Sequence, residues 1–400
     1  MEQLCIKCKG KGLCKKPCKI LSKFIDSAPR IKTHFSGSSP PEIFVGHANY
    51  PNVFSGILSP AQYGETEIFS IPELWVKNNL SIEKILEYRG QMIYGRSMGN
   101  IKAQQKLNSS MQEFAMASKS VSAEFFLKKK PILNFTPSKI FSIMANPAPI
   151  EKVILEENPK VEKKVDYLVS DYDVKATAAL EELYKSSIQT SYLQKLLSAG
   201  LLGVKSQRKL VPTRWAITAI DDILSKKLLE KIKSYSEIDE MQIFSSEYNG
   251  NHYEFLVLPS MFSFEVIEAE MPENMWNQSQ KLFFMQDYEG FFSRKKYASN
   301  VAGAYYANRL GVCEYLEKIK KQASILILRE VRPEYYAPLG VGILREITRK
   351  AFEQNPEKPN SLQEAFGLMQ SRMKININEY LKNSRIIKDY GKQKTLKQFF

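Results

Sequence analysis

The sequence lacks several features that would place it in a large class of proteins. It has no uninterrupted apolar stretch long enough to span a bilayer, which argues against an integral membrane protein. The first residues, MEQLCIKCKGKGLCKKPCK, contain no apolar h-region, so we expect no secretory signal and a cytoplasmic location. The composition, 44% hydrophobic and 25% charged, is typical of a globular chain and excludes an intrinsically disordered one.

Signatures of common enzyme classes are also missing. The chain has no P-loop and no G-x-G-x-x-G, H-E-x-x-H or G-x-S-x-G motif. Its three histidines, His34, His47 and His252, are too few for His-rich metal or triad chemistry. These absences remove familiar reaction types and leave open whether the protein is an enzyme.

Basic residues are in excess. The net charge is +14 and the isoelectric point is near 9.3, a balance that favours a polyanionic partner, either nucleic acid or an anionic membrane surface. The charge is concentrated at the two ends, in residues 1–23 and 382–397. We favour nucleic acid, and with it an association with the nucleoid.

Four of the five cysteines fall in the first 18 residues. In a chain without a secretory signal, this clustering indicates a metal site rather than disulfides. Four thiolates close a tetrahedral Zn²⁺ site with no open position, so we predict a structural zinc module; the alternatives are an iron–sulfur cluster and four reduced thiols. The predicted ligands are Cys5, Cys8, Cys14 and Cys18. The fifth, Cys313, lies in a helical pattern and is expected to be a buried structural thiol.

The segment QKTLKQFF predicts a docking peptide. Leu396, Phe399 and Phe400 are spaced i, i+3 and i+4, so one helical turn places them on one face, and Gln393 supplies a polar contact. Aromatic side chains inserted in a partner's pocket are common anchors of peptide recognition. The segment resembles the peptide by which repair and replication proteins bind the sliding clamp, proliferating cell nuclear antigen (PCNA). The alternative is an amphipathic tail that folds back on its own core.

The order of helical and strand patterns, without regular βαβ alternation, indicates an α+β fold. We predict four parts: a zinc module (1–23), a large domain (24–280), a smaller domain (281–390) and a flexible docking tail (391–400). Expected strands are 42–46, 165–171, two within 252–270, and 324–331, and 146–164 is expected to be an exposed connection. Expected helices are 81–94, 103–117, 174–199, 300–322, 341–352, 361–373 and 379–387.

Several long phrases now identify a relationship. CIKCKGKGLC, GSSPPEIFVGHANYPNVFSGILSP, LLSAGLLGVKSQRKLVPTRWAITAIDD and REVRPEYYAPLGVGILRE resemble the archaeal Nre DNA-repair family over nearly the whole chain. The resemblance implies a large N-terminal and a smaller C-terminal region, a role in the repair of DNA damage, and binding to the clamp. It implies no settled biochemical activity.

Two internal segments are candidate ligand sites. In GVKSQRKLVPTRW, cations beside an aromatic side chain suit phosphate contact and base stacking; the alternative is a solvated loop with Trp215 in the core. The stretch 35–60, rich in Gly and Pro, is either a nucleotide or phosphate pocket or a purely architectural wrap. The candidate DNA contacts are Lys205, Arg208, Lys209, Arg214 and Trp215.

Carboxylates cluster in FEVIEAE and again shortly after it. Strand alternation would place Glu268 and Glu270 on one face, and with Asp287 they are candidate catalytic ligands for Mg²⁺ in phosphodiester cleavage. Ordinary solvated strand faces are the alternative. Three functions therefore compete: a clamp-recruited factor that binds damaged or branched DNA, a repair enzyme (a Mg²⁺-dependent nuclease or a nucleotide-using modifier), and a clamp adaptor that does not touch DNA.

Overall fold

The computed structural model describes residues 19–102, 106–132, 145–272, 274, 277 and 279–390. These residues form two compact units. We call them the N-terminal unit (19–224 with 337–343) and the C-terminal unit (225–336 with 344–390). The mixture of helices and two separate sheets confirms the α+β class predicted from the sequence.

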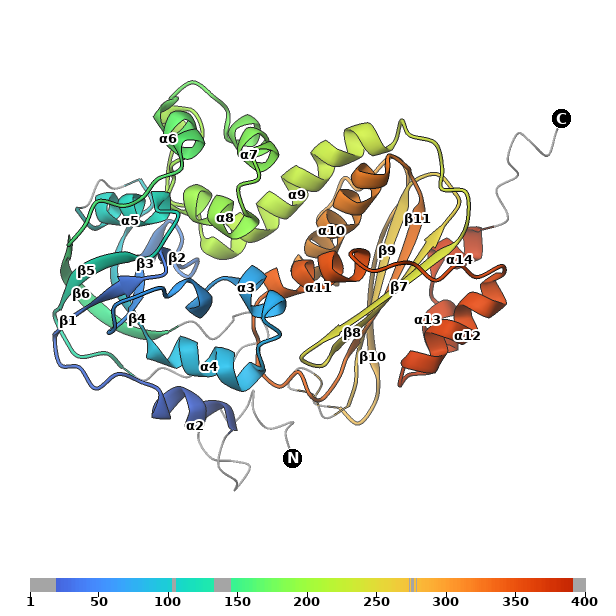
Figure 1. Cartoon of the computed structure of the whole chain (residues 1–400), viewed down its shortest axis with the longest axis horizontal. Coiled ribbons are helices and arrows are strands. Elements are labelled where there is room, and N and C mark those ends of the chain that lie inside the picture. The colour runs from blue at the N-terminus through green and yellow to red at the C-terminus, as the bar shows by residue number, and fades with distance from the viewer. Residues whose placement is uncertain are drawn as a thin grey trace. The chain divides into compact units, whose positions relative to one another are not determined.

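The N-terminal unit is built on a six-stranded sheet of order β1-β5-β6-β4-β3-β2, with helices packed around it (Figure 1). All neighbouring strands are antiparallel except β4 and β6, which are parallel. The strands are β1 (His34–Ser39), β2 (Glu42–Val45), β3 (Asn52–Pro60), β4 (Met92–Asn100), β5 (Val121–Leu127) and β6 (Asn146–Leu155). The helices are α2 (Lys19–Asp26), η2 (Glu67–Phe69), α3 (Pro72–Lys77), α4 (Ile82–Gln91), α5 (Lys106–Met116), α6 (Lys163–Ser170), α7 (Ala176–Lys185), α8 (Thr190–Ser198) and η3 (Lys205–Gln207).

The C-terminal unit contains a five-stranded mixed sheet of order β10-β9-β11-β8-β7, in which only β9 and β11 are parallel. The strands are β7 (Gln242–Tyr248), β8 (Asn251–Leu258), β9 (Ser263–Glu270), β10 (Phe283–Glu289) and β11 (Ser324–Val331). The helices are α10 (Gly303–Ile319), α11 (Gly342–Phe352), α12 (Leu362–Arg372), α13 (Ile377–Leu381) and α14 (Arg385–Asp389). The division at 224/225 falls within α9 (Thr213–Ile232), and the division at 343/344 falls within α11.

Helices cover both faces of this second sheet (Figure 1). Apolar residues of β8, β9 and β11 pack on one face against α12, α13 and α14. On the other face Phe264 meets Tyr305 of α10 edge to face at 5.0 Å, and Phe255 packs on Phe352 of α11 at 5.1 Å. Every residue of β8 and β11 is therefore buried, which explains why SILILREV is a continuous apolar run that ends in charged residues.

Some sequence-based predictions were wrong, and the reasons are local. The segment 165–171 was predicted as a strand, but its residues 165–170 lie in α6, because the buried Val165, Leu168 and Val169 follow helical rather than strand spacing. The segment 146–164, predicted as an exposed connection, begins with strand β6, which pairs with both β4 and β5. The single helix predicted over 174–199 is interrupted between α7 and α8, where Ser187 has φ of 62°.

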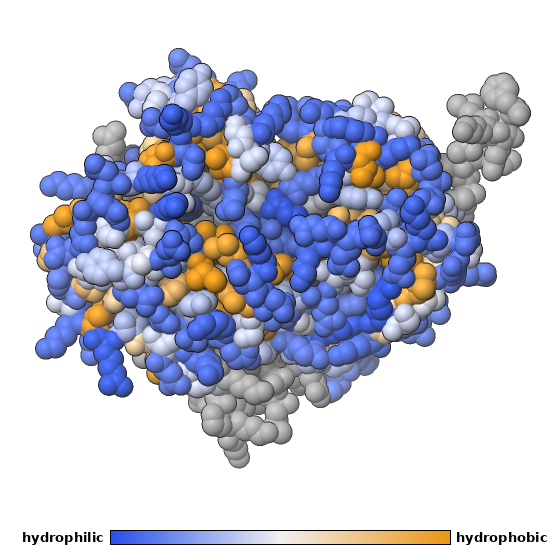
Figure 2. Space-filling view, viewed as in Figure 1, coloured by the Kyte–Doolittle hydropathy of each residue, from blue (hydrophilic) through white to orange (hydrophobic). Residues whose placement is uncertain are grey.

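The visible face of the molecule is mostly hydrophilic (Figure 2). One group of hydrophobic residues gathers near the position that α3 occupies in Figure 1. Within the described residues, no helix is both long and apolar enough to cross a membrane.

Candidate nucleic-acid interface

The loop 290–300, GFFSRKKYASN, displays aromatic and basic side chains together in the C-terminal unit. The side chain of Phe292 is 93% exposed and that of Tyr297 is 53% exposed. Lys295 and Lys296 are exposed beside them and, within the described part of the chain, neither forms an ion pair. Aromatic faces next to free ammonium groups are the arrangement that stacks bases while holding phosphates.

Arg294 fixes the conformation of this loop. Its Nη1 lies 2.8 Å from Oδ1 of Asp287 and donates to the carbonyl of Tyr288 at 3.1 Å. Its Nε and Nη2 donate to the carbonyls of Lys296 and Tyr297, at 3.2 and 3.1 Å. One guanidinium thus holds both ends of the segment that carries the exposed lysines. The display is consequently ordered before any ligand binds, which lowers the entropic cost of binding.

Two further contacts support the loop. Lys233 donates to the Ser293 hydroxyl at 2.7 Å and lies over the ring of Phe291 at 5.3 Å. Tyr297 stacks on Tyr306 of α10 with ring centroids 5.2 Å apart. The loop is therefore connected to the helical layer as well as to the end of β10.

The lysines of the loop open onto a groove of about 960 Å³, which we call the basic groove. The groove is also lined by α14, whose Arg385 and Lys388 are exposed. Buried Glu265 holds the start of α14, since it accepts hydrogen bonds from the Ser384 hydroxyl at 2.6 Å and from the Ile386 N–H at 3.0 Å. Three carboxylates also line the groove, those of Asp287, Glu289 and Asp389.

In the N-terminal unit, the structure brings together the two segments that the sequence marked as candidate ligand sites. Trp215 is 44% exposed rather than part of the core, and its ring centroid lies 5.0 Å from that of Tyr50. Arg208, by contrast, donates to three backbone carbonyls at 2.7 to 2.8 Å and so supports its own loop. The other candidate cations of this segment are exposed: Lys205, Lys209 and Arg214.

Comparison with known proteins gives consistent results along the whole chain. A family model described as "Archaeal Nre, N-terminal" matches residues 13–277, and one described as "Archaeal Nre, C-terminal" matches residues 289–399. The chain is 34% identical to the DNA repair protein NreB of Archaeoglobus fulgidus, over 99% of each chain.

The chain belongs to the archaeal Nre family.

Two other Nre proteins are similar to it. The DNA repair protein NreA of Archaeoglobus fulgidus is 36% identical over 90% of this chain and 91% of its own length. The DNA repair protein NreA of Haloferax volcanii is 35% identical over 79% of this chain and 78% of its own length. No solved structure matches the chain significantly. The two family models meet between residues 277 and 289, whereas the compact units divide at 224/225, because β7, β8 and β9 share a sheet with β11.

The candidate catalytic carboxylates of this Nre protein are engaged within the fold. Glu268 forms an ion pair with Arg329, and both side chains are buried. Asp287 accepts hydrogen bonds from the backbone N–H groups of Asn300 and Val301, at 3.0 and 2.8 Å, in addition to its Arg294 contact. The third, Glu270, is also buried.

In the part of the chain that the structure describes, no open carboxylate cluster accompanies them. Glu289, next to Asp287 along β10, binds the buried Arg309 at 3.1 Å. Among the described residues, no group of three or more His, Cys, Asp or Glu side chains is arranged to hold a metal ion. Glu268, Asp287 and Glu289 each have a structural partner, and the nuclease alternative has no geometric support in the described residues beyond the residue types themselves.

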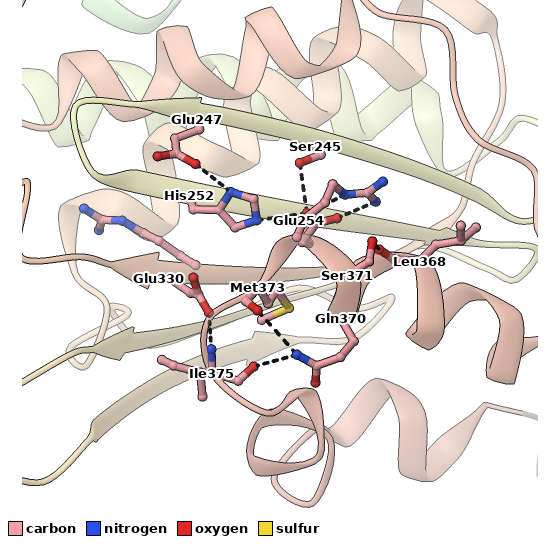
Figure 3. A network of polar contacts seen from close by, with 12 residues as sticks. Ser245, Glu247, His252, Glu254, Glu330, Leu368, Gln370, Ser371, Met373 and Ile375 are labelled. Atoms are coloured by element: carbon pink, nitrogen blue, oxygen red, sulfur yellow. Dashed lines mark hydrogen bonds and ion pairs between the residues drawn. The ribbon is translucent and has the colours of Figure 1, made fainter.

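His252 lies at the centre of a polar network in the C-terminal unit (Figure 3). Its Nε2 is 2.9 Å from Oε1 of Glu254, and its Nδ1 is 3.3 Å from Oε2 of Glu247. Glu254 also accepts from the Ser245 hydroxyl and from two guanidinium nitrogens of Arg372, each at 2.9 Å. Because Glu254 is fully buried and satisfied, we interpret the network as the connection between β7, β8 and the end of α12.

The predicted zinc ligands (Cys5, Cys8, Cys14, Cys18) and the predicted clamp-binding residues (Gln393, Leu396, Phe399, Phe400) lie outside the described residues. The nucleic-acid contacts predicted from the sequence did not include the 290–300 loop. The signal was present in FFSRKKY, where aromatic residues flank three consecutive cations.

Proposed function

We propose that this Nre protein is a DNA-repair factor that is recruited by the sliding clamp and contacts DNA through the basic groove and the 290–300 loop. The observation that carries the proposal is the ordered display of Phe292, Lys295 and Lys296 beside exposed cations of α14. The names of its relatives support a role in DNA repair.

The position of the groove along the chain supports joint action with the clamp. Asp389 and Lys388 line the groove, and the proposed clamp-binding segment begins at Gln393, a few residues further along the chain. A short tether of this kind keeps the effective concentration of DNA near the groove high once the clamp encircles DNA. In this proposal the clamp supplies recruitment, and the groove supplies the direct contact with the nucleic acid.

Lys295→Ala/Lys296→Ala is expected to weaken binding to fork and single-stranded DNA about tenfold near 0.15 M salt. A plot of the logarithm of the association constant against the logarithm of salt concentration should have a slope that is shallower by roughly 1.4 to 1.8. Each lost phosphate contact reduces the magnitude of this slope by about 0.7 to 0.9. Fluorescence anisotropy over a salt series measures both quantities, on single-stranded, duplex, flap and fork DNA.

Two variants complete this experiment. Phe292→Ala should weaken binding to single strands by about 1 to 3 kcal/mol with little change in salt slope, since it removes stacking and no charge. Lys128→Ala/Lys129→Ala removes the same charge from exposed lysines of the N-terminal unit and serves as the matched control. An equal loss in this control would show that binding follows net charge, and would remove the groove from the proposal.

We also propose that the four N-terminal cysteines hold one structural zinc ion. Metal analysis should find about one zinc per chain, lost in Cys5→Ser/Cys8→Ser and retained in Cys313→Ala. Cys313 is a suitable control because burial raises the pKa of its thiol and keeps it protonated, a poor state for binding metal. Stoichiometric iron with visible absorbance would replace zinc by an iron–sulfur cluster.

A further inference from the structure

A second site lies in the N-terminal unit, in a cavity of about 150 Å³ along α8. Ser191, Gln194, Lys195 and Ser198 all line it. Their spacing of three and four residues places them on one face of the helix, so α8 presents a polar stripe to the cavity. The remaining wall is largely apolar and includes Ile43, Trp75, Ile85, Leu86 and Leu339.

Two polar atoms of this stripe lack partners. Ser198 is 1% exposed, and its hydroxyl forms no hydrogen bond. The buried Nε2 of Gln194 likewise donates to no group. A buried donor without an acceptor costs about 1 to 3 kcal/mol, so two of them beside one cavity indicate an acceptor atom that enters from outside.

Lys195 supplies an amine on the same face of α8. Its Nζ donates to the Ala117 carbonyl at 3.2 Å and lies 4.5 Å from the centre of the Tyr192 ring. Burial lowers the pKa of Lys195 to about 7, although the carboxylates of Glu42, Glu67 and Glu73 oppose the shift. A lysine with its pKa lowered in this way is more readily uncharged, and therefore more nucleophilic, near neutral pH than an exposed lysine.

The charge around the cavity excludes an anionic ligand. Arg89 on its wall is already paired, since it binds both carboxylate oxygens of Glu42 at 2.6 and 3.2 Å. The three carboxylates that act on Lys195 would repel a further negative charge. The volume suits a molecule of only a few non-hydrogen atoms, and the unpartnered donors require that it carry an oxygen acceptor.

We propose that this cavity is a reaction site for a small, uncharged aldehyde, which Lys195 captures as a Schiff base while Ser198 and Gln194 hold the carbonyl oxygen. The neutral Nζ attacks the carbonyl carbon and forms a carbinolamine. Loss of water from the carbinolamine gives the imine, so one amine and one aldehyde yield one imine and one water, with no change in oxidation state. This activity is separate from DNA binding by the 290–300 loop and does not depend on it.

The test is reductive trapping on the full-length protein. Glycolaldehyde and sodium cyanoborohydride at pH 7, followed by peptide mass spectrometry, should modify Lys195 at least about tenfold faster than exposed lysines such as Lys209. The rate at Lys195 should level off above pH 7, whereas exposed lysines should react faster up to about pH 10. Modification of Lys195 at or below the rate of Lys209 would overturn the proposal.

Ser198→Ala tests the oxygen-binding part of the site. It should slow trapping at Lys195 several-fold while the thermal melting curve stays near that of the unmodified protein, because the hydroxyl has no partner to lose. Trapping at the original rate in Ser198→Ala would also overturn the proposal, since the lysine would then be reactive without a built site.

A further arm tests whether the aldehyde must be small and uncharged. An oligonucleotide with an abasic site, which exposes a sugar aldehyde between two phosphates, replaces glycolaldehyde in the same reaction. Trapping of glycolaldehyde but not of the oligonucleotide is the expected result. A covalent complex with the oligonucleotide that disappears in Lys195→Arg would overturn the assignment to a small, uncharged aldehyde, and trapping of neither would exclude the site.

Discussion

Removal of residues 393–400 is expected to abolish binding to the sliding clamp and to leave the melting temperature unchanged. The two phenylalanines and Leu396 are the predicted anchors, and truncation of an anchor commonly costs 2 kcal/mol or more. Loss of several anchors together should therefore weaken the dissociation constant by more than about 100-fold. Isothermal titration calorimetry with the purified clamp measures the effect.

Point variants separate the anchors from the charge of the segment. Phe399→Ala/Phe400→Ala should reproduce the truncation, whereas Lys394→Ala/Lys397→Ala should retain most of the affinity because the lysines lie outside the matched positions. A fall of several degrees in melting temperature on truncation would contradict the docking peptide. It would instead favour a tail that packs on its own core.

Glu268→Gln is expected to reduce the free energy of unfolding by about 3 kcal/mol. The reason is the buried Arg329, which would be left without its ion-pair partner. Burial alone would lower the pKa of Arg329, but the Glu268 carboxylate and neighbouring tyrosines raise it, so the guanidinium stays charged. Chemical denaturation monitored by circular dichroism gives the change in stability.

The double variant Glu268→Gln/Arg329→Met should recover part of this loss, because it removes the unpaired charge as well. Glu353→Gln provides the matched control: its carboxylate is exposed, so the change should stay within about 0.5 kcal/mol. The single variant Glu268→Gln also tests the nuclease alternative. Unchanged stability together with loss of Mg²⁺-dependent DNA cleavage would show that Glu268 is catalytic and would contradict its structural role.

Local signals in the sequence were sufficient for several elements. The helical spacing over 81–94 and 361–373 predicted α4 and α12, and each begins at a serine whose side chain accepts a backbone N–H in the first turn. The apolar run at 324–331 predicted a buried strand, which is β11. The family was identifiable from long segments, because a match over many consecutive residues rarely arises by chance. The zinc site inferred from the cysteine spacing and the clamp-docking peptide inferred from QKTLKQFF stay predictions from the sequence alone.

Other features depended on contacts between distant residues, which local patterns do not encode. The strand pairing of 146–155 arises from β4 and β5, and its proline-rich sequence alone indicated a connection. Glu268 looked like a solvated or catalytic carboxylate until β11 placed Arg329 beside it. Tyr50 and Trp215 are far apart in sequence and meet only in the fold.

The two proposed sites also combine features that the sequence determined with features that only the tertiary structure decided. The sequence determined which residues are present in the 290–300 loop and on α8, and hence their charge and their chemistry. Only the tertiary structure decided that Arg294 orders that loop and that Lys195 lies in a largely apolar cavity beside unpartnered donors. The physical reason is that desolvation, burial and hydrogen-bond satisfaction depend on which distant segments surround a side chain.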